Sequence, residues 1–211
     1  MIFLVKAIVI PGELVSEERK KLGGHVFIEN GKIYSDSLGI VSNEGMSVSV
    51  IPLQGKYMPF KGDLIVGVVA EEKFAGYIVD INSFYFSFVP KSETREQLKV
   101  GTIISAKIID VNEINEADLS DLRVFYGGEI VSVSPVKVPR VIGKNGSMLD
   151  VLKNGTGCNI LVGRNGRIWV KGGNVELFLK AIHKIENEAH LSNLTNKMTE
   201  FMLKEKPEKV Q

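Results

Sequence analysis

Between residues 138 and 148 the chain reads Val138-Pro139-Arg140-Val141-Ile142-Gly143-Lys144-Asn145-Gly146-Ser147-Met148. Two glycines enclose a Lys-Asn pair, and the serine that follows is a residue type that caps the first turn of a helix. Glycine lets one backbone approach another closely, the lysine can reach a phosphate, and the N-terminus of the following helix adds partial positive charge. A loop of this composition is suited to holding the backbone of a nucleic acid.

The segments around this loop have the periodicity of short helices and strands. A short apolar run precedes it, and residues 148–153 predict a helix with one apolar side. Strands are predicted over 159–162 and 167–171, and apolar residues spaced three and four apart predict a helix over 174–191. Helix, glycine loop, helix, two strands and helix is the order of a KH domain, whose loop clamps about four single-stranded nucleotides. We therefore predict a KH domain over 131–191.

A second Gly-x-x-Gly element, Gly163-Arg164-Asn165-Gly166, lies between the two predicted strands. Hairpin geometry explains its glycines, so we interpret it as a turn without a ligand. The element at 143–146 is not a P-loop, because the Gly-Lys-Ser/Thr ending is missing, and no parallel βαβ unit surrounds it.

Charge is distributed unevenly along the chain. The net charge is +1, but residues 1–130 hold 13 basic and 18 acidic side chains, whereas residues 131–211 hold 13 and 7. Residues 131–172 contain seven basic side chains and one acid. Such an excess suits a polyanion, and a solvated basic face is the alternative. The candidate RNA-binding residues in this part are Arg140, Gly143, Lys144, Asn145, Gly146 and Lys153.

Residues 59–130 have the pattern of a small barrel. The predicted strands are 64–70, 76–81, 83–90 and 102–111, with a fifth over 122–125 or 129–133. Five short strands with glycine at the bends favour a closed barrel of the OB type.

Six aromatic side chains crowd into residues 74–88 of this barrel. OB folds stack single-stranded bases on exposed aromatic rings in a positively charged groove. Filling the barrel core is the alternative role, and the more common one for most of these rings. The candidate RNA contacts in the barrel are Tyr77, Phe86, Lys91 and Arg95.

The two ends of the chain complete the domain organisation. Residues 1–58 consist of short apolar runs separated by glycine and include Asn30-Gly31, a strong hairpin signal, so they predict a small all-β domain. Residues 192–211 are polar and lysine-rich and predict a short helix followed by a tail. The expected fold is therefore multi-domain and mainly β, with an α+β C-terminal part.

Catalysis has little support in the sequence. Cys158 is the single cysteine, the three histidines are scattered, and the carboxylates lack the paired spacing of a two-metal nuclease. We expect no metal and no cofactor. The apolar runs are far shorter than the roughly 20 residues that a membrane span needs, and the first residues lack a basic leader. We therefore expect a cytoplasmic protein without a membrane partner.

Several runs of sequence resemble the RNA-binding cap subunits of archaeal exosomes. They are residues 135–148, 165–172 and 181–190, with residues 50–57 and 61–67 upstream. The resemblance extends in order over nearly the whole chain. It implies an N-terminal β domain, an OB barrel of the ribosomal-protein-S-one type and a KH domain, with the boundaries given above.

The resemblance also implies a role without chemistry. In this family, three cap subunits sit on a hexameric ring of phosphorolytic RNase-PH-like subunits and recruit single-stranded RNA, A-rich tails included, towards 3′-to-5′ active sites. The implied partners are single-stranded RNA, the ring subunits and the other cap subunits. The chain departs from the family at residues 112–122, which are acidic where the family has a glycine-rich approach to the last barrel strand.

A free-standing single-stranded RNA-binding regulator of translation or transcript stability is the alternative hypothesis. Its KH domain and barrel would have the same sequence features. The N-terminal domain distinguishes the two, because an adaptor should expose apolar or strand-edge surface there and a free-standing module should cover it.

Overall fold

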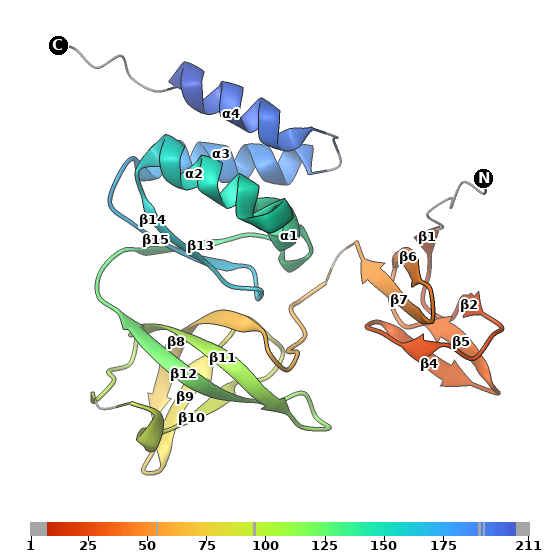
Figure 1. The fold of residues 1–211 in the computed structure, drawn as a ribbon. Coiled ribbons are helices and arrows are strands. Elements are labelled where there is room, and N and C mark those ends of the chain that lie inside the picture. The colour runs from red at the N-terminus through yellow and green to blue at the C-terminus, as the bar shows by residue number, and fades with distance from the viewer. Residues whose placement is uncertain (1–7, 54, 95, 190, 192, 206–211) are drawn as a thin grey trace. The chain divides into compact units, whose positions relative to one another are not determined.

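The computed structural model describes residues 8–53, 55–94, 96–189, 191 and 193–205. By its contacts the chain forms two compact units, residues 1–55 and residues 56–211. The second unit contains a closed barrel together with a helix-covered sheet (Figure 1).

The first unit is all β, as predicted. One sheet has the strand order β1-β6-β7-β3 and the other the order β2-β5-β4. The strands are β1 (Ile8–Val9), β2 (Leu14–Ser16), β3 (Lys21–Leu22), β4 (Val26–Glu29), β5 (Lys32–Ser35), β6 (Gly39–Glu44) and β7 (Ser47–Pro52). Asn30 and Gly31 have φ values of 49° and 78° and join β4 to β5, which confirms the predicted hairpin.

The barrel closes in the order β10-β12-β11-β8-β9. Its strands are β8 (Leu64–Glu72), β9 (Gly76–Asp80), β10 (Ser87–Pro90), β11 (Ile103–Val111) and β12 (Ala117–Phe125). The fifth strand therefore includes residues 122–125, the first of the two alternatives. Alternation accommodates the acidic residues of β12, because Ala117 and Leu119 are buried while Asp118 between them is exposed.

The KH fold is confirmed over the rest of the second unit. β13 (Glu129–Ser132), the other candidate for the fifth barrel strand, instead joins a sheet of order β13-β15-β14 with β14 (Asn159–Val162) and β15 (Arg167–Lys171). The helices are α1 (Val138–Ile142), α2 (Ser147–Thr156), α3 (Val175–Glu188) and α4 (Leu194–Glu205). Figure 1 shows the helices on one face of this sheet. Asn174 caps α3, because its side-chain Oδ1 accepts a hydrogen bond of 2.9 Å from the backbone N–H of Leu177.

Helix α4 is the short helix predicted in the polar, lysine-rich segment 192–211, and one of its faces is buried in the KH core. Leu194, Met198 and Met202 are each at most 5% exposed and share one helix face, being four residues apart. They pack into the same core as α2 and α3. An added Cβ at Gly155 of α2 would lie 2.7 Å from the sulfur of Met202, so glycine permits this close approach. Burial of such side chains contributes roughly 1.5–3 kcal/mol each to stability.

Candidate nucleic-acid interface

The glycine loop between α1 and α2 has backbone angles that favour glycine and asparagine. Gly143, Asn145 and Gly146 all have positive φ, at 75°, 53° and 83°. A Cβ on Gly143 would lie 2.7 Å from the backbone nitrogen of Met148, so a side chain at this position would clash with the start of α2. Asparagine is one of the few residues with a side chain that adopts the left-handed region readily. The loop therefore holds its two central side chains outward, and both Lys144 and Asn145 are exposed.

The start of α2 carries no side-chain cap. Gly146 occupies the cap position, and the structure gives it no side-chain hydrogen bond. Ser147, which the sequence suggested as the cap, is instead the first residue of the helix. The first N–H groups of the helix are consequently not occupied by a capping side chain, and they add partial positive charge beside Lys144.

A cleft of about 330 Å³ lies between this loop and the beginning of α4. Arg140, Gly143 and Lys144 line it from one side and residues 193–196 from the other, and no acidic side chain is among its described lining residues. Lys153 is exposed but lies in the last turn of α2 and does not line the cleft. The structure thus brings Arg140 together with Gly143 and Lys144 of the predicted loop and leaves Lys153 at the other end of the helix.

The second Gly-x-x-Gly element is a hairpin turn, but its asparagine has a further role that sequence reasoning missed. Asn165 is fully buried, and its side-chain Nδ2 donates hydrogen bonds to the carbonyls of Val66 (2.7 Å) and Ile81 (2.8 Å). Its Oδ1 accepts the N–H of Val66 at 3.2 Å, and its own carbonyl accepts Nδ2 of Asn82 at 2.9 Å. The turn therefore fastens the KH sheet to the barrel.

Arginines of the hairpin make barrel contacts too. Arg167 donates from Nη1 to the carbonyl of Asp80 (2.6 Å) and from Nη2 to its carboxylate (2.7 Å). Partial burial alone would raise the pKa of Asp80, but the Arg167 guanidinium and the N–H of Asn82 outweigh it and lower that pKa. Arg164 lies 3.7 Å from the carboxylate of Asp63. The basic excess of residues 131–172 therefore overstates the charge that an RNA would meet.

The barrel residues predicted to bind RNA differ in their burial and in their contacts. Tyr77 is a core residue, 2% exposed, with its hydroxyl accepting the N–H of Leu98 at 3.2 Å, so its assignment as a stacking platform was wrong. Its position on β9 points it inward. Lys91 is exposed but pairs with Glu72 at 3.0 Å. Arg95 lies outside the described residues, and Phe86 is exposed.

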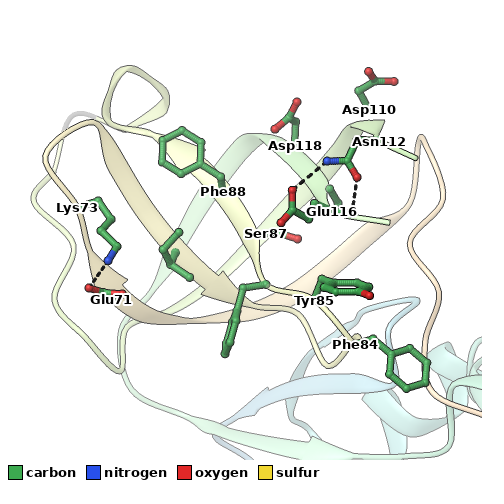
Figure 2. Close-up of a pocket in the computed structure, with 13 residues that line it drawn as sticks. Glu71, Lys73, Phe84, Tyr85, Ser87, Phe88, Asp110, Asn112, Glu116 and Asp118 are labelled. Atoms are coloured by element: carbon green, nitrogen blue, oxygen red, sulfur yellow. Dashed lines mark hydrogen bonds and ion pairs between the residues drawn. The ribbon is translucent and has the colours of Figure 1, made fainter. Parts of the chain in front are cut away.

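Phe86 belongs to a loop, and the predicted strand over 83–90 is confined to β10 (Ser87–Pro90). Together with Phe84 and Tyr85 it borders an open groove of about 470 Å³ on the barrel, shown in Figure 2. Carboxylates from β8, β11 and β12 also line this groove. The acidic lining distinguishes the groove from the cleft beside the KH loop.

Comparison with known proteins identifies the family. Residues 6–54 match the model of the exosome RNA binding protein RRP4 N-terminal domain, and residues 128–176 match that of a KH domain. Exosome complex component Rrp4 of Methanothermus fervidus is 42% identical over 212 residues, which cover 93% of this chain and 95% of that protein. The chain belongs to the Rrp4 family of exosome complex components.

Further relatives agree with this membership. Rrp4 of Methanosarcina barkeri is 42% identical, with 95% of this chain and 83% of that protein covered. A crystal structure assigned to an exosome complex RNA-binding protein is 32% identical and superposes with a TM-score of 0.64, covering 71% of this chain and 97% of that one. In the described part of this Rrp4-family chain, no helix is long and apolar enough to cross a membrane, and no group of three or more His, Cys, Asp or Glu side chains is placed to hold a metal.

Proposed function

We propose that this chain is a non-catalytic, cytoplasmic cap subunit of an exosome that recruits single-stranded RNA, A-rich RNA included, to a hexameric ring of RNase-PH-like subunits. One observation carries the RNA part of the proposal. In a chain of the Rrp4 family, Lys144 and Asn145 are exposed between two glycines of positive φ, at a helix start without a side-chain cap. Lys144 also shares with Arg140 a cleft that has no acidic side chain among its described lining residues.

In this proposal the KH loop is the main RNA contact. Gly143 and Gly146 let the phosphate backbone approach, Lys144 and Arg140 neutralise phosphates, and Asn145 offers an amide to a base or sugar. Lys153, at the far end of α2, would meet a neighbouring phosphate. The barrel contributes less, because Lys91 is already paired and carboxylates surround Phe86.

The N-terminal unit supports an adaptor over a free-standing regulator. It exposes many large apolar side chains for a unit of its size: Ile8, Ile10, Leu14, Leu22, Phe27, Ile28, Leu38, Met46, Ile51 and Leu53. Large exposed apolar surface commonly marks a protein interface. The charge of this part of the chain does not favour phosphate, so we assign it to docking on the ring.

Deletion of residues 1–55 should abolish association with the ring while leaving the second unit folded. The two units are separate in their contacts, and the second has its own barrel and KH cores. The measurement is co-elution of the truncated chain with reconstituted ring subunits in size-exclusion chromatography. The full chain carrying Lys144→Ala, which changes only the KH loop, should still co-elute. Co-elution of the truncated chain would place docking on the second unit instead.

The purified full chain should bind a labelled oligoadenylate yet release no nucleotide from it. Among the described residues, no group of three or more His, Cys, Asp or Glu side chains is placed to hold a metal that would activate an attacking group. Binding is measured by fluorescence anisotropy and release by gel electrophoresis, each with and without Mg²⁺ and inorganic phosphate. Shortening of the oligonucleotide that persists after the chain is purified to homogeneity would contradict the proposal of a non-catalytic subunit.

A further inference from the structure

The groove on the barrel combines exposed aromatic rings with acidic side chains. Phe84, Tyr85 and Phe86 are 63%, 49% and 57% exposed, although large apolar surfaces of this kind are usually covered in a folded protein. Asp110, Glu116 and Asp118 line the same groove, and Figure 2 shows these carboxylates and the rings of Phe84 and Tyr85 around it. The KH loop proposed to bind RNA contributes nothing to this groove.

Two of the carboxylates are held in an unfavourable arrangement. Asp110 and Asp118 are directly opposite each other in the antiparallel pair of β11 and β12, so their side chains project from the same face. Like charges in this position destabilise a sheet. The neighbouring cation, Lys61, lies 3.7 Å from Asp110, and both of these side chains are about three-quarters exposed, so water screens their attraction. A cation bound between the two carboxylates would relieve the repulsion.

Strand alternation shows which side chains form this groove. Phe88 on β10 lies opposite Ile78 and Asp118 on the neighbouring strands, and these three side chains share the outward face of the barrel. Ser87 and Val89 are buried and share the other face of β10, on the side of the barrel core. The groove is therefore formed by outward-facing side chains of the barrel.

The chain itself shows that this aromatic loop accepts a cation. Nζ of Lys56 lies 5.0 Å from the centre of the Phe84 ring, which is within the range of a cation–π contact. Tyr85 and Phe86 have no such contact in the described structure and remain exposed. Their rings offer a surface for a second cation.

We propose that this groove binds an arginine-bearing segment of a protein partner. A guanidinium is planar, so it can stack on the ring of Phe86 or Tyr85 while it donates hydrogen bonds to Asp118 and Glu116. A lysine ammonium would pair with the carboxylates, but it would not stack on an aromatic ring as a planar guanidinium does. RNA is disfavoured, because carboxylates outnumber cations in the described lining and Lys73, a cation there, is already paired with Glu71. The groove is thus a protein-binding surface separate from the KH loop.

The test uses the full chain and three labelled probes: a tetra-arginine peptide, a tetra-lysine peptide and an oligoadenylate. Asp110→Asn, Glu116→Gln and Asp118→Asn are combined in one variant. The matched control combines Glu29→Gln, Glu176→Gln and Glu200→Gln, which are exposed elsewhere and change the net charge equally. We expect the groove variant to weaken arginine-peptide binding about tenfold and the control less than about twofold. Phe86→Ala should weaken the arginine peptide more than the lysine peptide.

A thermal melt of each variant shows whether weaker binding comes from a loss of folding. Because the groove variant removes the repulsion between Asp110 and Asp118, it should unfold at the same temperature as the parent or a higher one. Equal weakening of the arginine peptide by the groove variant and the control would reduce the effect to general electrostatics and overturn the proposal. Weakened oligoadenylate binding in Phe86→Ala, with the peptides unaffected, would make the groove an RNA site instead. RNA binding that depends on Lys144 is measured separately and is untouched by either result.

Discussion

Replacement of Asn165 with aspartate should lower the midpoint of thermal unfolding of the barrel and KH unit by roughly 10 °C. The side-chain amide now donates to the carbonyls of Val66 and Ile81, both in the barrel. A carboxylate cannot donate, and it would place a buried negative charge against two carbonyl oxygens. An uncompensated buried charge costs roughly 3–5 kcal/mol. The midpoint is read from far-UV circular dichroism.

Asn145→Asp is the matched control for this prediction. It makes the same chemical change at the same position of the other Gly-x-Asn-Gly sequence. Asn145 is exposed beside a helix N-terminus, where an acid is mildly favourable by roughly 0.3–1 kcal/mol, so its midpoint should hold or rise slightly. If Asn165→Asp melts like the parent, the hydrogen bonds to the barrel do not hold the two parts together. Equal losses of stability in the two variants would mean that both loops are structural.

This pair of loops also shows what a local pattern can and cannot predict. Their sequences differ at a single position, lysine against arginine, and the surrounding periodicity correctly placed one before a helix and the other in a hairpin. Burial of Asn165 depends on Val66, which is 99 residues away in sequence. No spacing within the hairpin encodes such a contact. Within the hairpin, the sequence shows only a polar residue in a turn that is longer than the two residues needed to connect two antiparallel strands.

Two further features that the sequence analysis missed, the burial of Tyr77 and of one face of α4, also have physical causes. The aromatic ring of Tyr77 suggested stacking, but the direction of a side chain on β9 depends on the register of the barrel, which fixes it in the core. The composition of residues 192–211 predicted the short helix but not its burial, although Leu194, Met198 and Met202 stand at helical spacing. In the KH half, by contrast, apolar periodicity and glycine positions are local properties, and the order of elements followed from them.

The double variant Lys144→Asp, Asn145→Asp should weaken binding of single-stranded RNA by at least about tenfold at moderate salt and flatten its salt dependence. For a single strand, removal of one phosphate interaction reduces the slope of log affinity against log salt by about 0.7. Repulsion between the new carboxylates and the phosphates weakens binding further. Aspartate tolerates the positive φ of position 145, and both side chains are exposed, so the fold should be preserved.

The measurement is anisotropy of a labelled oligoadenylate at several salt concentrations, with a thermal melt of each variant. Lys204→Asp combined with Asn30→Asp changes the net charge equally at exposed positions outside the KH loop, and Asp-Gly still forms the turn at residues 30–31. This control should retain most of the affinity and the full salt slope, because it keeps Lys144, the loop cation proposed to neutralise a phosphate. A steep slope retained by the Lys144/Asn145 variant would mean that phosphates do not bind at this loop. The phosphates would then be met by other exposed cations of the KH domain, such as Arg140 and Lys153.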